Sequence, residues 1–340
     1  MSDMTRKPGG PAAQAPADDA PPAEARQIAE MADILQRKMA RDYAAGITRR
    51  DAHPKSLGVL RASFTIEPGL PEGLRVGLFA QQRRCDCWLR LSSASGKPQS
   101  DAVPDLRGLA IKLLGDDGQP LGQDFVLLSH PTMPLGTVAL FRDAVYYTIE
   151  RSTLLLAAKL ALTGQLGVLW RLNAARTRPN SPLDIRYWST TPYRFGSDAA
   201  VKYSLIPRSA HQSPAPGQCG DDYLSAAMAA HLAGHEAVFD FCVQRQLPGM
   251  PIEDAAVRWA ENLSPFQKVA TLRIAPQAFR TPEREALGET LSFSPGHALP
   301  DHTPLGGINR ARIAIYGQLS AFRHARDGRA DSGLIGPGRA

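Results

Sequence analysis

Residues 57–129 contain five short apolar runs: LGVLRASFTI (57–66), GLRVGLFA (73–80), CDCWLRLSS (85–93), RGLAIKLL (107–114) and FVLLS (125–129). Turn-forming sequences rich in Gly, Pro, Asp and Ser separate them, such as PGLPEG and GDDGQP. Runs of this length and spacing predict closely spaced antiparallel strands. Because there are so many of them, we expect a barrel or a sandwich.

Helical patterns lie on both sides of these strands. Residues 26–44 repeat apolar side chains every three or four positions, which predicts an amphipathic helix. Further helices are predicted at 137–175, with interruptions near Gly164 and Gly167, at 222–233 and at 308–326, and further strands at 187–207, 237–247 and 268–274. Strands and helices do not alternate regularly along the chain. We therefore expect an α+β fold with an antiparallel β-barrel core surrounded by helices.

The composition indicates one folded domain with flexible ends. The chain has 340 residues, of which 43% are hydrophobic, enough to build a core. Residues 1–25 are dominated by Pro, Ala, Gly and Asp, so we expect a disordered tail, then a single domain over 26–330 and a flexible C-terminus at 331–340. Four scattered cysteines favour reduced thiols and a cytoplasmic location. Cys85 and Cys87 alternate on a strand and are expected to be buried, apolar fillers.

Charge and hydropathy exclude two classes of partner. The net charge is +6, but no basic run is interleaved with aromatic residues, so nucleic acid is not an expected partner. The most apolar window, 152–172, contains Lys159 and Gln165. A membrane-spanning helix needs about 20 nearly uninterrupted apolar residues. We therefore expect a helix packed on protein and no integral membrane segment.

Common cofactor and nucleophile motifs are missing from the sequence. It contains no GxGxxG, GxxxxGK[ST] or GxSxG motif. His231 and His235 are four residues apart and could share a metal ion on a helix, but Gly234 suggests that the helix ends there. Ordinary surface or core histidines are the favoured interpretation, and zinc is the alternative.

Four distant segments carry the residues expected to perform chemistry. Arg50 and His53 lie in RRDAHPKS, just ahead of the first strand, where Pro54 favours an extended backbone. Ser92 and Arg107 stand at the ends of successive strands, and Ser129 ends the strand of QDFVLLS. The fourth segment begins with Phe293 in FSPGH and continues into the last helix, where Arg312 and Tyr316 are four residues apart and share a face.

In this order the segments resemble the catalase superfamily, and within it the small haem-containing, catalase-related peroxidases. The R-x-x-x-Y helix of that family provides a tyrosinate ligand to haem iron, a role that the resemblance assigns to Tyr316 as axial ligand of haem b. Arg312 is then the cation that keeps the phenol ionised. Phe293 resembles the aromatic residue that packs against the porphyrin.

The same resemblance implies a distal site. His53 is similar to the distal histidine, and Ser92, in LRLSS, to the serine that orients it. Arg50 and Arg107 resemble the arginines that bind the haem propionates, a role that suits the bidentate guanidinium. Chemically, one neutral imidazole can remove a proton from bound peroxide and return it to the leaving oxygen.

One difference from the family favours peroxidase chemistry over dismutation. Catalases carry a distal asparagine where this sequence has Ser129, and a hydroxyl is shorter than an amide. We therefore expect reduction of hydrogen peroxide or organic hydroperoxides by a small organic electron donor, with weak or no catalase activity. The alternatives are a fatty-acid hydroperoxide-transforming enzyme, a non-catalytic haem-binding protein and a cofactor-free barrel that binds a lipid. A homodimer is the expected assembly.

Overall fold

The computed structural model describes residues 20–217 and 219–328. Its strands are β1 (Ser56–Ile66), β2 (Arg84–Ser93), β3 (Arg107–Leu114), β4 (Pro120–Leu128), β5 (Tyr187–Trp188), β6 (Tyr193–Phe195), β7 (Ala199–Pro207), β8 (Ala237–Arg245) and β9 (Gln267–Ile274). Within the described residues, eight of them form an antiparallel barrel in the order β5-β4-β3-β2-β1-β9-β8-β7, and β6 is added to β7. The barrel closes because β5 pairs with both β4 and β7. The predicted α+β barrel is confirmed.

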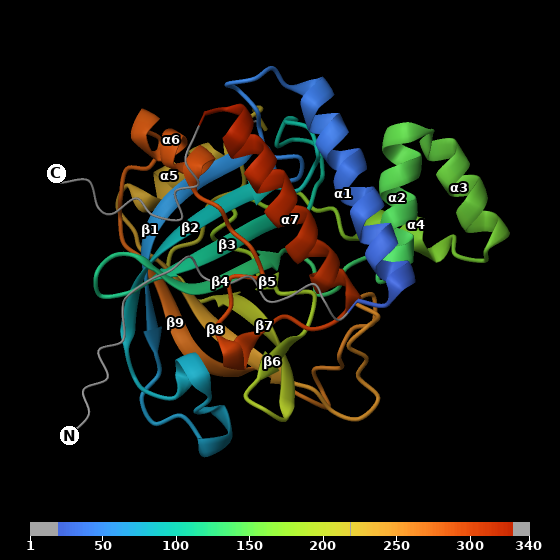
Figure 1. The fold of residues 1–340 in the computed structure, drawn as a ribbon. Coiled ribbons are helices and arrows are strands. Elements are labelled where there is room, and N and C mark those ends of the chain that lie inside the picture. Colours follow the sequence, from blue (N-terminus) through green and yellow to red (C-terminus); the bar gives the residue numbers. More distant parts are fainter. Residues whose placement is uncertain (1–19, 218, 329–340) are drawn as a thin grey trace, which may run out of the picture.

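Helices surround this barrel (Figure 1). They are α1 (Pro22–Asp42), α2 (Val138–Glu150), α3 (Thr153–Leu162), α4 (Gly167–Ala174), α5 (Tyr223–Leu232), α6 (Pro282–Thr290) and α7 (Gly307–Arg326). An apolar cluster that includes Ile34, Val145 and Ile315 joins α1, α2 and α7. In Figure 1, α7 passes in front of β2–β4, and α3 and α4 lie farthest from the barrel.

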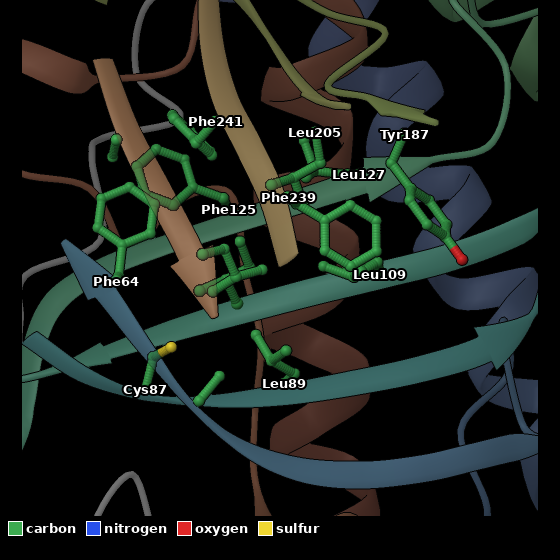
Figure 2. Close-up of a cluster of buried hydrophobic side chains, with 14 of the residues drawn as sticks. Phe64, Cys87, Leu89, Leu109, Phe125, Leu127, Tyr187, Leu205, Phe239 and Phe241 are labelled. Carbon is green, nitrogen blue, oxygen red and sulfur yellow. The ribbon is translucent and has the colours of Figure 1, made fainter. Parts of the chain in front are cut away.

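The barrel interior is filled with side chains. Figure 2 shows part of this core, in which the ring centroids of Phe125 and Phe241 are 4.6 Å apart and those of Phe64 and Phe241 are 5.0 Å apart. An eight-stranded barrel has an interior just wide enough for such packing. Cys87 lies in this core and Cys85 is also buried, as predicted. A large cofactor must therefore bind outside the barrel.

Strand alternation places a second set of side chains on the outer face. Register pairs Arg90 with Ala110, and Ser92 with Gly108, so these four residues point to the same side of β2 and β3. Their neighbours in sequence, such as Leu89 and Leu91, point into the core and are fully buried. The outer face of β2 and β3 is the one that carries the candidate site.

Three predicted elements differ from the structure. Residues 73–80 form two short 3₁₀ turns, η2 (Glu72–Leu74) and η3 (Gly77–Phe79), instead of a strand. The backbone turns at Gly77, where φ is +49°, and buries Leu78 and Phe79 against the core, so the apolar run reflects burial and not a strand. The helix predicted at 137–175 is three helices, because Arg151 and Ser152 interrupt it as well as Gly164. Helix α6 was not predicted.

The ends of the helices agree more closely. Helix α5 and helix α7 match the predictions at 222–233 and 308–326 within one residue at each end. Helix α1 begins at Pro22, so residues 22–25 are helical and do not belong to the expected tail. Proline at the first helical position explains this start, because an N–H group at that position would have no partner within the helix. Residues 1–19 and the expected flexible C-terminus at 331–340 lie outside the described residues.

Candidate active site

His53 is held in an unusual backbone conformation ahead of β1. Its φ is +58°, a left-handed value that is uncommon for a residue with a side chain and that corrects the extended backbone expected ahead of Pro54. The guanidinium of Arg90 donates a hydrogen bond to the His53 carbonyl at 2.8 Å. His53 Nδ1 lies 2.9 Å from Ser92 Oγ. The structure thus brings together the predicted pair His53 and Ser92, and it adds Arg90, which was not predicted.

Gly108 leaves the space in which the imidazole ring lies. A Cβ atom at this position would be 2.7 Å from His53 Cε1 and Nδ1 and 2.9 Å from Ser92 Oγ, closer than real Cβ contacts. Gly108 is paired with Ser92 across β2 and β3, so the two strands and the loop before β1 together fix the ring. Its Nδ1 is engaged by the serine. Its Nε2 is the nitrogen left to exchange a proton with a bound molecule.

The imidazole is neutral over the ordinary pH range. Burial, the largest cause, and the charges of Arg90, Arg312 and Arg50 together lower the pKa of His53 from 6.5 to about 3. A neutral ring can accept a proton, whereas an imidazolium cannot. The influence of Arg312 also shows that α7 faces the His53 side of the barrel.

Three arginines gather around one carboxylate beside this histidine. We call Arg50, Arg90 and Arg323, together with Glu289, the arginine cluster. Arg50 Nη1 lies 3.7 Å and Arg323 Nη1 lies 3.9 Å from Glu289 Oε2. Two buried donor atoms, Arg50 Nη1 and Arg90 Nε, have no hydrogen-bond partner. Buried donors are normally satisfied, so these two atoms are free to donate to an acceptor such as a carboxylate.

The pKa values of these arginines reflect the same excess of positive charge. Burial, together with Arg90 and Arg323, lowers the pKa of Arg50 well below its usual value. Burial lowers the pKa of Arg90 to about 10, and Arg323 contributes to this shift. An added carboxylate or two would offset the repulsion between these arginines.

Arg107 does not join this cluster, which corrects its predicted role. Register places Arg107 opposite Ser93, on the other face from Ser92. Its guanidinium donates to Ser93 Oγ and to the carbonyls of Asp101 and Val103, and the side chain is 1% exposed. Arg107 is therefore a buried structural residue at the end of the barrel core. Ser129 is linked to the same place, because its Oγ accepts a hydrogen bond of 2.8 Å from the Arg107 backbone N–H.

Arg312 and Tyr316 share the buried side of α7, as predicted. The Arg312 guanidinium carbon lies 5.6 Å from the centroid of the Tyr316 ring. Arg312 Nη1 also donates to Thr191 Oγ1 at 3.3 Å and to Asn309 Oδ1 at 3.4 Å. Burial opposes the charge of Arg312, but Tyr316 and Tyr193 raise its pKa overall.

Phe293 lies on the same outer barrel face, near a buried ion pair. Its ring packs with Val59 and Trp88, and Lys112 Nζ lies 5.5 Å from the ring centroid. Lys112 in turn contacts both oxygens of Asp124, at 2.8 and 2.9 Å. Phe293 is thus an apolar surface on the site's side of β1–β3.

A cleft of about 1060 Å³ borders the arginine cluster. It runs along residues 54–59, which follow His53 directly, and its other wall includes residues 279–290. Glu289 lines it and is also the carboxylate of the cluster. The cleft thus connects solvent with the edge of the site.

Comparison with known proteins identifies the fold. No protein-family model and no curated protein sequence matches the chain. Solved structures match it well: a fungal catalase has a TM-score of 0.66 at 16% identity, catalase A from Saccharomyces cerevisiae has 0.63 at 14%, and a bacterial catalase has 0.64 at 16%. The chain has the catalase fold. These alignments cover 84%, 85% and 95% of the chain respectively.

The same catalase structures are considerably longer than this chain. The alignments cover 61%, 62% and 64% of their lengths, so the chain spans about three fifths of the catalases that it matches. At this level of identity the likeness concerns the fold alone. The chemistry of this site has to be argued from its own residues.

Sequence reasoning missed three members of the arginine cluster, and each left a signal. Arg90 is two residues before Ser92 on a strand, so alternation places both on one face. Arg323 is seven residues after Tyr316, two turns along the same helix. Glu289 left a weaker signal, because helix α6 itself was not predicted.

The two histidines of HLAGH are not part of this site. His231 is buried at the end of α5, and its ring centroid lies 6.4 Å from that of His235. Across residues 20–217 and 219–328, no three His, Cys, Asp or Glu side chains are placed to hold a metal ion together.

Proposed function

We propose that this chain is a haem-dependent peroxidase that reduces hydrogen peroxide or organic hydroperoxides with a small organic electron donor, and that it has little catalase activity. The observation that carries the proposal is the arginine cluster, where two buried guanidinium nitrogens have no hydrogen-bond partner next to a neutral, oriented histidine. The catalase fold supports it, as does the Arg312–Tyr316 pair on the facing helix. We also propose that residues 26–330 form the single haem-binding domain.

The residues present fit haem b. Its two propionates are carboxylates, and the arginine cluster offers unsatisfied donors to carboxylates. Tyr316 would provide an oxygen ligand to the iron, and Phe293 an apolar surface for the porphyrin. When bound, haem would supply an iron that binds peroxide and accepts electrons from the donor.

The protein's own groups then manage the protons. His53 Nε2 takes the proton from the inner peroxide oxygen, and Ser92 holds the ring in place through Nδ1. The same nitrogen returns this proton to the other peroxide oxygen, which leaves as ROH when the O–O bond breaks. The overall reaction converts ROOH to ROH and water, and the donor loses two electrons and two protons. The cleft beside residues 54–59 gives a small donor access to the edge of the site.

Ser129 accounts for the expected weakness of dismutation. Its hydroxyl accepts the backbone N–H of Arg107, which ties it to the end of β3. Leu128 pairs with Gly108, so strand alternation puts Ser129 on the other face from His53, where it cannot replace an amide that positions a second hydrogen peroxide. The ratio of donor oxidation to oxygen release should therefore be high.

The test is the visible spectrum of protein expressed with added haem, followed by addition of peroxide. We expect a Soret band of tyrosinate-ligated ferric haem that changes with hydrogen peroxide and with cumene hydroperoxide. Oxidation of a phenol such as guaiacol should follow, with little oxygen release in an oxygen electrode. A colourless protein that also fails to bind haemin would refute the proposal. If the protein retained haem but did not oxidise the donor, and His53→Ala changed neither result, a non-catalytic haem-binding protein would instead be favoured.

A further inference from the structure

Helices α3 and α4 form a hairpin at the edge of the molecule (Figure 1). A small apolar cluster attaches the hairpin to α2, with Leu156, Leu160 and Val168 as its buried members. The sequence predicted a helix here that packs on protein, but most of the apolar residues in this segment do not pack against other parts of the chain. The connection between the two helices contains Gly164, which has a φ of +68° and nothing within 4 Å of where a Cβ would lie. The tip of the hairpin thus projects away from the rest of the chain.

The outer surface of this hairpin is apolar and exposed. Leu162 is 89% exposed, Leu154 77% and Trp170 73%. Leu155, Leu166 and Leu169 are exposed as well. Single exposed leucines are common on protein surfaces, but six large apolar residues within 154–170 form a patch of the kind that marks an interaction site.

The charged residues of the segment that carries the patch are all positive, although Asp143 and Glu150 of α2 lie next to it. Residues 151–183 contain no Asp or Glu, whereas they contain Arg151, Lys159, Arg171, Arg176 and Arg178. Among the ion pairs that the structure gives for these five cations, only Lys159 has a carboxylate partner, Asp143 on α2 at 2.7 Å. Leucine and tryptophan flanked by basic residues are typical of segments that bind at the surface of an anionic bilayer.

We propose that the α3–α4 hairpin binds the surface of membranes that contain anionic lipids. Leu162 and Trp170 would enter the headgroup region, and the flanking arginines would contact lipid phosphates. No helix within the described residues is long and apolar enough to cross a bilayer. A second copy of this chain is a poorer occupant, because a twofold interface would bring two basic patches together. This binding does not depend on haem or on the proposed peroxidase activity.

Vesicle flotation of the full chain tests the proposal. We expect the protein to float with vesicles of equal phosphatidylglycerol and phosphatidylcholine, and to float much less with phosphatidylcholine alone. Raising salt from about 50 to 500 mM should release it, since screening weakens contacts to phosphates. The variant L162N/W170S should bind at least 10-fold more weakly. The control Leu263→Asn removes a leucine that is 66% exposed elsewhere on the surface and should bind like the wild type.

Trp170 gives an independent signal, because it is the most exposed of the four tryptophans. Its emission should shift to the blue on addition of anionic vesicles, and Trp170→Phe should lose this shift while still binding. Absence of binding to anionic vesicles at low salt would overturn the proposal. So would wild-type binding by L162N/W170S. If that variant instead dissociated a dimer in sedimentation velocity, and no vesicle binding occurred, the patch would be a contact between two copies of the chain.

Discussion

Replacing Gly108 with alanine tests whether His53 acts from the position that the structure gives it. The added Cβ would lie 2.7 Å from His53 Cε1 and Nδ1, whereas ordinary contact begins at 3.4 Å. The ring must therefore move by at least about 0.7 Å, which separates Nδ1 from Ser92 Oγ. The backbone cannot easily yield, because Gly108 is paired on both sides, with Ser92 and with Leu128.

We expect the second-order rate constant for reaction with peroxide to fall by about 10- to 100-fold in Gly108→Ala. A misplacement of about 1 Å near a reacting group can cost a factor of about 100. Haem content should change little, since Tyr316 and the arginine cluster lie on other elements. Overpacking of this kind typically costs about 1–3 kcal/mol of stability, which thermal unfolding can measure. Stopped-flow absorbance in the Soret region measures the rate.

The matched control is Gly96→Ala. A Cβ at Gly96 would meet nothing closer than the Asp51 carbonyl oxygen at 3.5 Å, an ordinary contact. This variant should react like the wild type. If Gly108→Ala reacted at the wild-type rate with full haem content, His53 would not be the group that transfers the proton.

Three further predictions follow from the same geometry. Tyr316→Phe should weaken haem retention by at least about 10-fold in haemin titrations because the anionic ligand is lost, whereas Tyr146→Phe should not; equal affinity would remove Tyr316 as ligand. Arg90→Gln should lower haem affinity more than the control Arg61→Gln, since Arg61 lies on the same barrel face but pairs with Asp86. Similar affinities in the two variants would contradict a propionate site in the cluster. The rate with peroxide should stay flat from pH 8 to about 4, because the pKa of His53 is about 3, and a midpoint near 6.5 would contradict this. The unfolded imidazole titrates near 6.5, so the contribution of this residue to stability is lost as the pH falls from 6.5 toward 3.

Much of the fold was predictable because strand alternation and turn residues are local signals. The strands corresponding to β1–β3 and the helix α7 were located closely from apolar spacing alone, whereas β4 begins at Pro120, five residues before the predicted strand. Residues 73–80 were assigned wrongly because a short apolar run is equally compatible with a strand and with a buried turn. Residues 152–172 were expected to pack on protein, yet hydropathy states only that a segment is apolar and not what covers it.

The site was predictable where partners lie close in sequence or follow a familiar pattern. His53, Ser92, Arg312 and Tyr316 were all named from sequence, and the structure places His53 with Ser92 and Arg312 with Tyr316. Arg107 was misassigned because a strand offers two faces, and only the pairing of β2 with β3 shows which face it uses.

An anion bound to the arginine cluster would act on the pKa of His53 in the direction opposite to the arginines themselves. Without an anion, Arg50 and Arg90 help to keep His53 neutral by repelling a proton. Carboxylates that bind to the cluster would offset these charges and raise the pKa of His53. Burial, however, is the largest cause of the low pKa, and a bound anion does not expose the ring to water. The imidazole should therefore remain a base after the anion binds, so the same arginines can hold a charged group close to His53 without protonating it.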